Sequence, residues 1–377
     1  MKQEHIVQAE ALSVLDRIKL EYADLVQSRS FSLEELFSPQ DFQFDEFCKT
    51  FSIYPQSEEL LGLSEAFGRE YGVWQAHTKY YINCAFLLYP RGGFERMLTI
   101  MKNLTVGFYL NDIMGRDLFK FLSLEEQKSS RKLIKNMADL DETADPGPGA
   151  GPIETANAIA LREFRDAAPR EWFLKFKRLY SYHLKITHRD CDTEAVGYLP
   201  EVDEYITRRC HLAGMNHIVL WVEFSDGRFL DWELLKKHSL SLKMERLHSL
   251  SAAFGALSND LFSFEKEVID NNSDSNLVAI VAMNKPYLCL EEAIEESSEI
   301  VRNVVMELVA LLDSMPAAIQ KLQGTQPALA DTLSTHLKGL VRFIQASWLW
   351  QLHARRYKRP HSIWHETTLA AAGKVTA

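Results

Sequence analysis

The chain has 377 residues, of which 46% are hydrophobic and 25% are charged, an ordinary composition for a soluble globular protein. Its formal net charge is −10 and no basic tract occurs, which argues against a nucleic-acid partner but leaves room for local Arg and Lys to hold a small anion. The five scattered cysteines favour reduced thiols in a cytoplasmic protein. The amphipathic first residues are not expected to form a signal peptide. No run approaches the roughly 20 apolar residues of a membrane span.

Most of the sequence predicts helices. Apolar residues recur at helical spacing from Val7 to Leu25, and a helix start is predicted at Ser57. Residues 90–93, Pro-Arg-Gly-Gly, then break the chain before the next apolar segment. Strand-like alternation is scarce and no hairpin is convincing, so we expect an all-α fold.

A long apolar helix is expected over residues 94–117, with acidic residues gathered at its C-terminal end. Asp112 and Asp117 stand there, Asn111 precedes them, and Phe108 lies one turn before Asp112 on the same face. Acids at this end of a helix oppose its macrodipole, so a cluster of cations should compensate them. The segment is a candidate metal site, with an ordinary frayed helix end as the alternative.

Two later segments suggest chemistry that we interpret as coincidental. Residues 139–152 contain several acids, but their prolines and glycines predict a surface loop between helices. The sequence His188-Arg189-Asp190 matches part of a kinase catalytic loop, yet the chain lacks the glycine-rich loop that should accompany it.

Two adjacent arginines, Arg208 and Arg209, lie on an otherwise apolar helix that leads to Ala213 and Gly214. Burying them unpaired would be costly, and a guanidinium fork matches phosphate oxygens. We expect Arg209 to be unpaired, or weakly paired to an acid, when no phosphate is bound. An ordinary ion pair with a carboxylate between helices is the alternative.

The stretch from Asn259 to Glu267 places oxygen donors four residues apart, with Ser263 between its two ends. On an α-helix these three side chains share one face, and amide, hydroxyl and carboxylate oxygens are ligands that Mg²⁺ prefers. Lys266 lies beside this line, where its ammonium could meet a phosphate. The alternative is an exposed polar face, although the apolar neighbours leave only a narrow polar stripe. Small residues before Asn259, such as Gly255, either leave room for a ligand or permit close helix packing.

After Pro286 the pattern returns to long amphipathic helices. The last of them carries Trp350, Arg356 and Tyr357. A solvated helix end is the alternative role for its basic residues. Residues 366–377 are small and polar, and we expect them to form a mobile tail.

These segments resemble class I terpene synthases of the microbial type. Residues 259–267 match the family's metal motif (N/D)D(L/I/V)x(S/T)xxKE at every defined position, whereas Asp112 and Asp117 fit its Asp-rich motif only in part. Arg209, with Arg208 as the alternative, resembles the family's diphosphate sensor. Trp350, Arg356 and Tyr357 resemble its closing WSxxTxRY segment, and the four segments occur in the family's order.

The resemblance implies one α-helical domain over residues 1–365, a bundle around a central apolar pocket. It implies a carbon–oxygen lyase that uses three Mg²⁺ ions to cyclise a linear isoprenyl diphosphate, farnesyl or geranylgeranyl diphosphate, and it allows a homodimer. The implied site residues are Asp112, Asp117, Asn259, Ser263 and Glu267 for metal, Arg209, Lys266, Arg356 and Tyr357 for catalysis, and Phe108, Arg208, Ala213, Gly214 and Trp350 for substrate binding.

Two alternatives of different kinds stay open. A chain-elongating prenyltransferase is the nearer one, although that family normally carries two Asp-rich motifs. A non-catalytic helical interaction protein is the other, since the Asp-rich segment is degenerate. Metal-dependent diphosphate release separates an enzyme from the latter, and product analysis separates a cyclase from an elongating enzyme.

Overall fold

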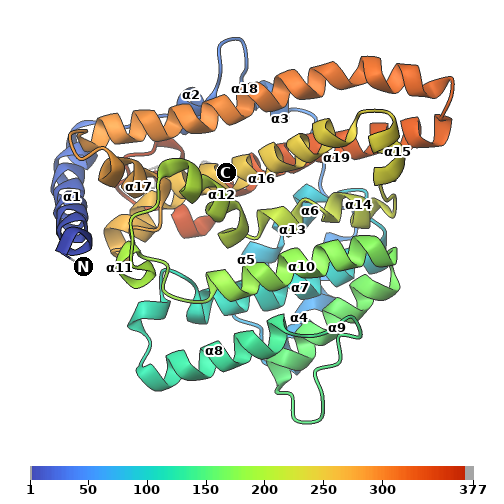
Figure 1. The fold of residues 1–377 in the computed structure, drawn as a ribbon, viewed down its shortest axis with the longest axis horizontal. Coiled ribbons are helices and arrows are strands. Elements are labelled where there is room, and N and C mark those ends of the chain that lie inside the picture. The colour runs from blue at the N-terminus through green and yellow to red at the C-terminus, as the bar shows by residue number, and fades with distance from the viewer. Residues whose placement is uncertain (1, 370–377) are drawn as a thin grey trace, which may run out of the picture.

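The protein is built from helices joined by loops, as a computed structural model that describes residues 2–369 shows (Figure 1). Two isolated bridges, Phe31 with Trp364 and Arg359 with Thr368, are the extent of β pairing in this range. The all-α prediction is therefore confirmed. In chain order the helices are α1 (Lys2–Ser28), α2 (Leu33–Phe37), α3 (Phe44–Cys48), α4 (Ser57–Glu70), α5 (Thr78–Ile82), α6 (Cys84–Leu88), α7 (Phe94–Met114), η1 (Phe119–Phe121), α8 (Leu124–Ala138), α9 (Pro152–Asp166), α10 (Arg170–Thr187), α11 (Thr193–Val196), α12 (Val202–Leu212), α13 (Met215–Ile218), α14 (Trp221–Asp226), α15 (Trp232–Lys237), α16 (Ser241–Phe264), η2 (Glu265–Asp270), α17 (Leu277–Asn284), α18 (Leu290–Gln323), α19 (Pro327–His353), η3 (Arg355–Tyr357) and η4 (His365–Thr367).

Two groups of helices face each other, with shorter helices between them. Helices α16, α18 and α19 pack against one another in the upper part of Figure 1. The Phe44 ring stacks against both Phe254 of α16 and Trp348 of α19. In the lower group, α7 packs against α4 and α9, and α10 packs against α8. Helices α12 and α13 contact both α10 and α16, so they join the two groups. None of the helices within residues 2–369 is long and apolar enough to cross a membrane.

Helix α7 ends three residues earlier than predicted. It begins at Phe94, directly after the predicted break, but stops at Met114, so Asp112 lies in its last turn and Asp117 lies beyond it. The backbone turns to the extended conformation at Gly115, with a ψ of 165°, while its N–H still donates to the carbonyl oxygen of Asn111 at 3.0 Å. A Cβ at position 115 would stand 2.3 Å from that same oxygen, so this capping conformation requires glycine.

Two other stretches that were predicted as regular helix change their geometry. Helix α16 ends at Phe264, and the chain continues as the π-helix η2. Because a π-turn holds one more residue than an α-turn, Glu267 does not follow Ser263 in the register of an α-helix. Helix α19 ends at His353, so Arg356 and Tyr357 lie in a separate 3₁₀ turn.

The π-helix is tied to two distant segments of the chain through Glu265. This buried carboxylate accepts hydrogen bonds from the Tyr22 hydroxyl at 2.8 Å, the Ser362 hydroxyl at 2.6 Å and the Ile363 N–H at 2.9 Å. Since Lys266 follows it directly, the position of the metal-motif residues depends on both segments.

The segment after residue 365 is held in place where the structure describes it. The Glu366 carboxylate accepts from the Ser32 hydroxyl and the Glu34 N–H, both at 3.0 Å, and Thr367 is buried. The expected mobile tail therefore does not begin at residue 366. Residues 370–377 lie outside the described residues.

Candidate active site

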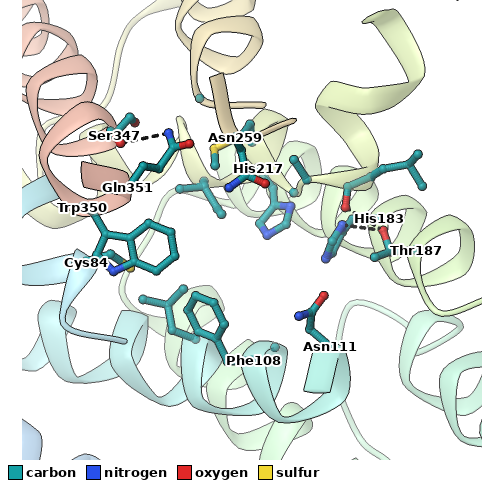
Figure 2. A pocket seen from close by; sticks show the side chains of 18 of the residues that line it. Cys84, Phe108, Asn111, His183, Thr187, His217, Asn259, Ser347, Trp350 and Gln351 are labelled. Carbon is teal, nitrogen blue, oxygen red and sulfur yellow. Dashed lines mark hydrogen bonds between the residues drawn. The ribbon is translucent and has the colours of Figure 1, made fainter. Parts of the chain in front are cut away.

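A cavity of about 200 Å³ lies between α6, α7, α10, α12, α13, α16 and α19 (Figure 2). Its wall has an apolar part, rich in aromatic side chains, and a polar part that carries several charges. The apolar part includes Leu88, Leu104, Phe108, Met215, Ile218, Trp221, Phe343 and Trp350. The polar part includes Asn111, Arg116, Asp117, Arg209, Asn259, Lys266, Glu267, Arg356 and Tyr357.

Arg209 is buried and forms a close ion pair with an acid, which contradicts the prediction that it is free or weakly held. Its Nε donates to Asp260 Oδ1 at 2.6 Å, and its Nη2 donates to Asn259 Oδ1 at 3.0 Å. Asp260 is 0% exposed and also accepts from the Tyr205 hydroxyl at 2.6 Å. Burial and the nearby Arg116 lower the pKa of Arg209, but Asp260, Tyr205 and Glu267 together outweigh them and the pKa is raised. No role was predicted for Asp260, although it is the second residue of the metal motif.

The break between α12 and α13 lies at the cavity. Helix α12 ends at Leu212, Ala213 and Gly214 line the cavity, and Gly214 has a left-handed φ of +73°. Arg209 lines the cavity on the same helix. Arg208 does not, and lines a small separate hollow instead. The geometry favours Arg209 as the residue that would meet a ligand.

The oxygen donors of the metal motif are only partly presented to the cavity. Asn259 and Glu267 line it, and Asn259 Nδ2 donates to the Tyr357 hydroxyl at 2.7 Å. The Ser263 hydroxyl instead donates to the backbone oxygen of Asn259 at 2.6 Å and does not line the cavity. Glu267 Oε2 accepts from Asn276 Nδ2 at 3.1 Å.

Arg116 is a further charged residue of the site, and no role was predicted for it. Its Nη2 donates to Glu267 Oε2 at 2.8 Å and lies 3.6 Å from Asp260 Oδ1, while its Nη1 donates to the backbone oxygen of Ser275. Burial opposes its charge, but Glu267 and Asp260 raise its pKa well above the ordinary value. The sequence did offer one sign of this role, because Arg116 is the single arginine in the acidic segment that ends at Asp117.

The acidic segment at the end of α7 meets the cavity through Asp117, one of its two predicted metal residues, and not through Asp112. Asp117 lines it and accepts from Lys266 Nζ at 2.7 Å and from Asn271 Nδ2 at 2.9 Å. Burial would raise the pKa of Asp117, but Lys266 above all lowers it to about 2. Asn111 also lines the cavity. Asp112 does not, and its Oδ2 is hydrogen-bonded to His77 Nε2 at 2.7 Å.

Arg356 adds a cation that has no carboxylate partner among the described residues. Its guanidinium lies over the ring of Tyr81, 5.0 Å from the centroid, and its buried Nε makes no hydrogen bond to them. Phe108 and Trp350 line the cavity close by, with their ring centroids 6.2 Å apart. The predicted aromatic residues and the closing Arg-Tyr pair thus face one space.

The donor atoms suit a hard divalent cation, although protein cations occupy them here. Asp117 and Glu267 offer carboxylates, and Asn259 offers an amide oxygen. Within residues 2–369 no cluster of three His, Cys, Asp or Glu side chains is arranged to hold a metal. The carboxylates instead bind Lys266 and Arg116, so a divalent cation would have to replace these partners.

Comparisons with known proteins agree with this architecture. Residues 102–307 match the family model described as "Terpene synthase family 2, C-terminal metal binding". The sesquiterpene cyclase hepA of Aspergillus oryzae is 23% identical over 185 residues, which are 49% of this chain and 47% of that protein. Spiroviolene synthase of Streptomyces violens is 26% identical over 163 residues, 43% of this chain and 41% of that protein. The chain therefore spans about half the length of the curated relatives it matches.

Solved structures match over a larger part of the chain. The crystal structure of a-eudesmol synthase has a TM-score of 0.65 at 19% identity and covers 80% of this chain and 96% of that chain. Germacradien-4-ol synthase from Streptomyces citricolor has a TM-score of 0.64 at 18% identity and covers 81% of this chain and 98% of that chain. At this level of identity the likeness shows a shared fold.

Proposed function

The chain belongs to terpene synthase family 2, whose metal-binding model matches residues 102–307 of its 377, and on that premise we propose that it is a class I terpene cyclase. Its substrate would be farnesyl or geranylgeranyl diphosphate. The observation that carries this proposal is one cavity whose polar part holds Arg209, Lys266 and Arg356 and whose remaining wall is apolar and aromatic. The expected homodimer and the cytoplasmic location stay predictions.

The proposed metal is Mg²⁺, with three ions as the family resemblance suggests. Asn259, Glu267 and Asp117 would hold it at the cavity, and Ser263 and Asp112 would join them after leaving their present hydrogen bonds. When bound, Mg²⁺ neutralises negative charge on the departing diphosphate.

The cations of the chain would bind the same leaving group. Breaking an allylic C–O bond moves negative charge onto diphosphate, and Arg209 and Arg356 can each offer two parallel N–H donors to its oxygens. Lys266 would act as a point charge, and the Tyr357 hydroxyl as a further donor. Because these groups are fixed in a largely buried place, their interactions with the new charge are stronger than they would be in water.

The apolar part of the cavity would guide the carbocation that remains. Its walls exclude water, which would otherwise capture the cation before cyclisation. The rings of Phe108, Trp221 and Trp350 line this part, and aromatic rings can stabilise positive charge. Gly107 also lines the cavity, and a Cβ there would meet no atom within 4 Å. The absence of a side chain at this position therefore leaves more space for the isoprenyl chain of the substrate.

The direct test is to incubate the purified protein with linear diphosphates of each chain length and Mg²⁺. We expect diphosphate release and cyclic products identified by mass spectrometry, both abolished by EDTA. Undiminished release in excess EDTA would refute the metal mechanism. Longer linear diphosphates formed with isopentenyl diphosphate would indicate an elongating enzyme, and no release from any substrate would indicate a non-catalytic protein.

A further inference from the structure

Three histidines, His183, His188 and His217, line the cavity, and the proposed function gives none of them a role. His183 on α10 and His217 on α13 point into the same space in Figure 2, and their ring centroids lie 5.0 Å apart. Burial lowers the pKa of His183 to about 4 and that of His217 well below its ordinary value. At neutral pH both rings are therefore uncharged and able to accept a proton.

The hydrogen bonds of His183 fix where its single ring proton lies. Its Nδ1 is 2.9 Å from the carbonyl oxygen of His211, which can only accept, so Nδ1 carries the hydrogen. The second neighbour, the Thr187 hydroxyl at 3.0 Å, gives its own proton to the Leu212 carbonyl at 2.9 Å and is free to accept. In the neutral ring the lone pair is consequently on Nε2, which has no hydrogen-bond partner among the described residues.

The other two histidines are less suited to accept a proton from a ligand. Both ring nitrogens of His188 are enclosed by protein. His217 packs edge-on against Tyr180 and Trp221, and among residues 2–369 no hydrogen bond fixes its tautomer. Gly214 makes room for the two rings that share the space, because a Cβ there would stand 2.8 Å from Cε1 of His217 and 3.3 Å from Cε1 of His183.

We propose that Nε2 of His183 is the base that ends the cyclisation, an inference that rests on the proposed function. A C–H bond next to the cationic carbon breaks, and its electron pair becomes the second bond of a new C=C. The proton forms an N–H bond on Nε2 and later passes to diphosphate or water as the product leaves. A weak base suffices, because a carbocation is a far stronger acid than an imidazolium ion. The main product is then an olefin.

His183→Asn tests this proposal, because the Asn amide can replace the Nδ1 donor but places nothing at Nε2. Diphosphate release should stay close to that of the wild type, since ionisation does not use His183. The share of the main wild-type olefin should fall at least about tenfold. This is a smaller effect than the rate factor of roughly 10²–10⁴ that a positioned general base contributes. His211→Asn is the matched control, because that side chain does not line the cavity, and its product profile should equal the wild type.

Circular dichroism establishes whether each variant is folded. If His183→Asn does not fold, His183→Gln carries the test, because Gln reaches the Nε2 position with a non-basic amide and should cause the same change in products. An unchanged product profile in a folded His183 variant would overturn the proposal while leaving the cyclase function intact, and so would an alcohol as the main wild-type product. No diphosphate release from the wild type would refute the proposed function itself and this inference with it.

Discussion

Replacing Asp260 with Asn should destabilise the protein, because it leaves the buried Arg209 without its anionic partner. Asp260 is fully buried and accepts from Arg209 Nε and the Tyr205 hydroxyl, both at 2.6 Å, and from the Leu277 N–H at 3.0 Å. An Asn amide would keep the shape but turn one of the two acceptor atoms into a donor. At least one of the three groups that now donate to Asp260 would lose its acceptor.

The expected cost follows from this burial. Arg209 is 3% exposed, and breaking a buried ion pair by removing one partner costs about 3–5 kcal/mol. At about 2.1 cal/mol/K per residue, the 377 residues give an unfolding entropy of about 0.8 kcal/mol/K. The loss therefore corresponds to a Tm lower by about 4–6 °C.

Thermal unfolding followed by circular dichroism or calorimetry measures this change. Asp166→Asn is the control, because Asp166 forms an exposed ion pair with Arg165 and its loss should cost at most about 1 kcal/mol. The double variant Arg209→Met with Asp260→Asn should recover part of the loss, since it removes the unpaired buried charge and leaves the Tyr205 hydroxyl and the Leu277 N–H an amide oxygen to donate to. A Tm within about 1 °C of the wild type for Asp260→Asn would refute the reasoning.

Three further predictions address catalysis and pH. Glu267→Gln should slow diphosphate release on the order of a hundredfold or more, and Asp117→Asn far less, because only Glu267 matches its motif in full; equal small losses would mean that the metal site is misplaced. Arg209→Lys should keep the circular dichroism spectrum but lose most release, at a cost of about 3 kcal/mol, whereas Arg208→Lys should be mild; full activity in both would make the pair structural. Burial raises the pKa of Glu223 from 4.5 to about 7, so its carboxyl is neutral in the folded state below pH 7, and stability falls as pH rises from 4.5 through 7. Glu223→Gln should therefore be more stable than the wild type by up to about 3 kcal/mol at pH 8 and nearly equal at pH 4, and equal Tm differences at both pH values would contradict this.

The parts of the site that a single helix positions could be predicted from the sequence. Arg209 precedes Gly214 by little more than one turn, and Asn259 lies on the long helix that ends at the metal motif, so local spacing placed each of them near the cavity. Where the helix geometry changed, the predicted helical register was wrong, although Asp117 and Glu267 still line the cavity. The cap at Gly115 put Asp117 outside α7, and the π-helix moved Glu267 out of α-helical register.

Pairing between distant elements could not be predicted. Arg209 and Asp260 are 51 residues apart, and Lys266 and Asp117 are 149 apart. The sequence contains several oppositely charged residues that could pair with each of these groups, and only the packing of the helices determines which pairs form. The tautomer of His183 depends on a backbone carbonyl, which no spacing of side chains reveals.

The Glu265 contacts bear on when the protein becomes active during its synthesis. Ser362 and Ile363 supply two of the donors to this buried carboxylate, and they are translated almost a hundred residues after it. Until they leave the ribosome, Glu265 lacks these partners, and a buried acceptor without partners costs about 1–3 kcal/mol. The π-helix that carries Lys266 and Glu267 is then held at the cavity by fewer contacts than in the finished protein. A nascent chain should therefore be unable to ionise an allylic diphosphate before it holds a complete cavity in which to control the cation.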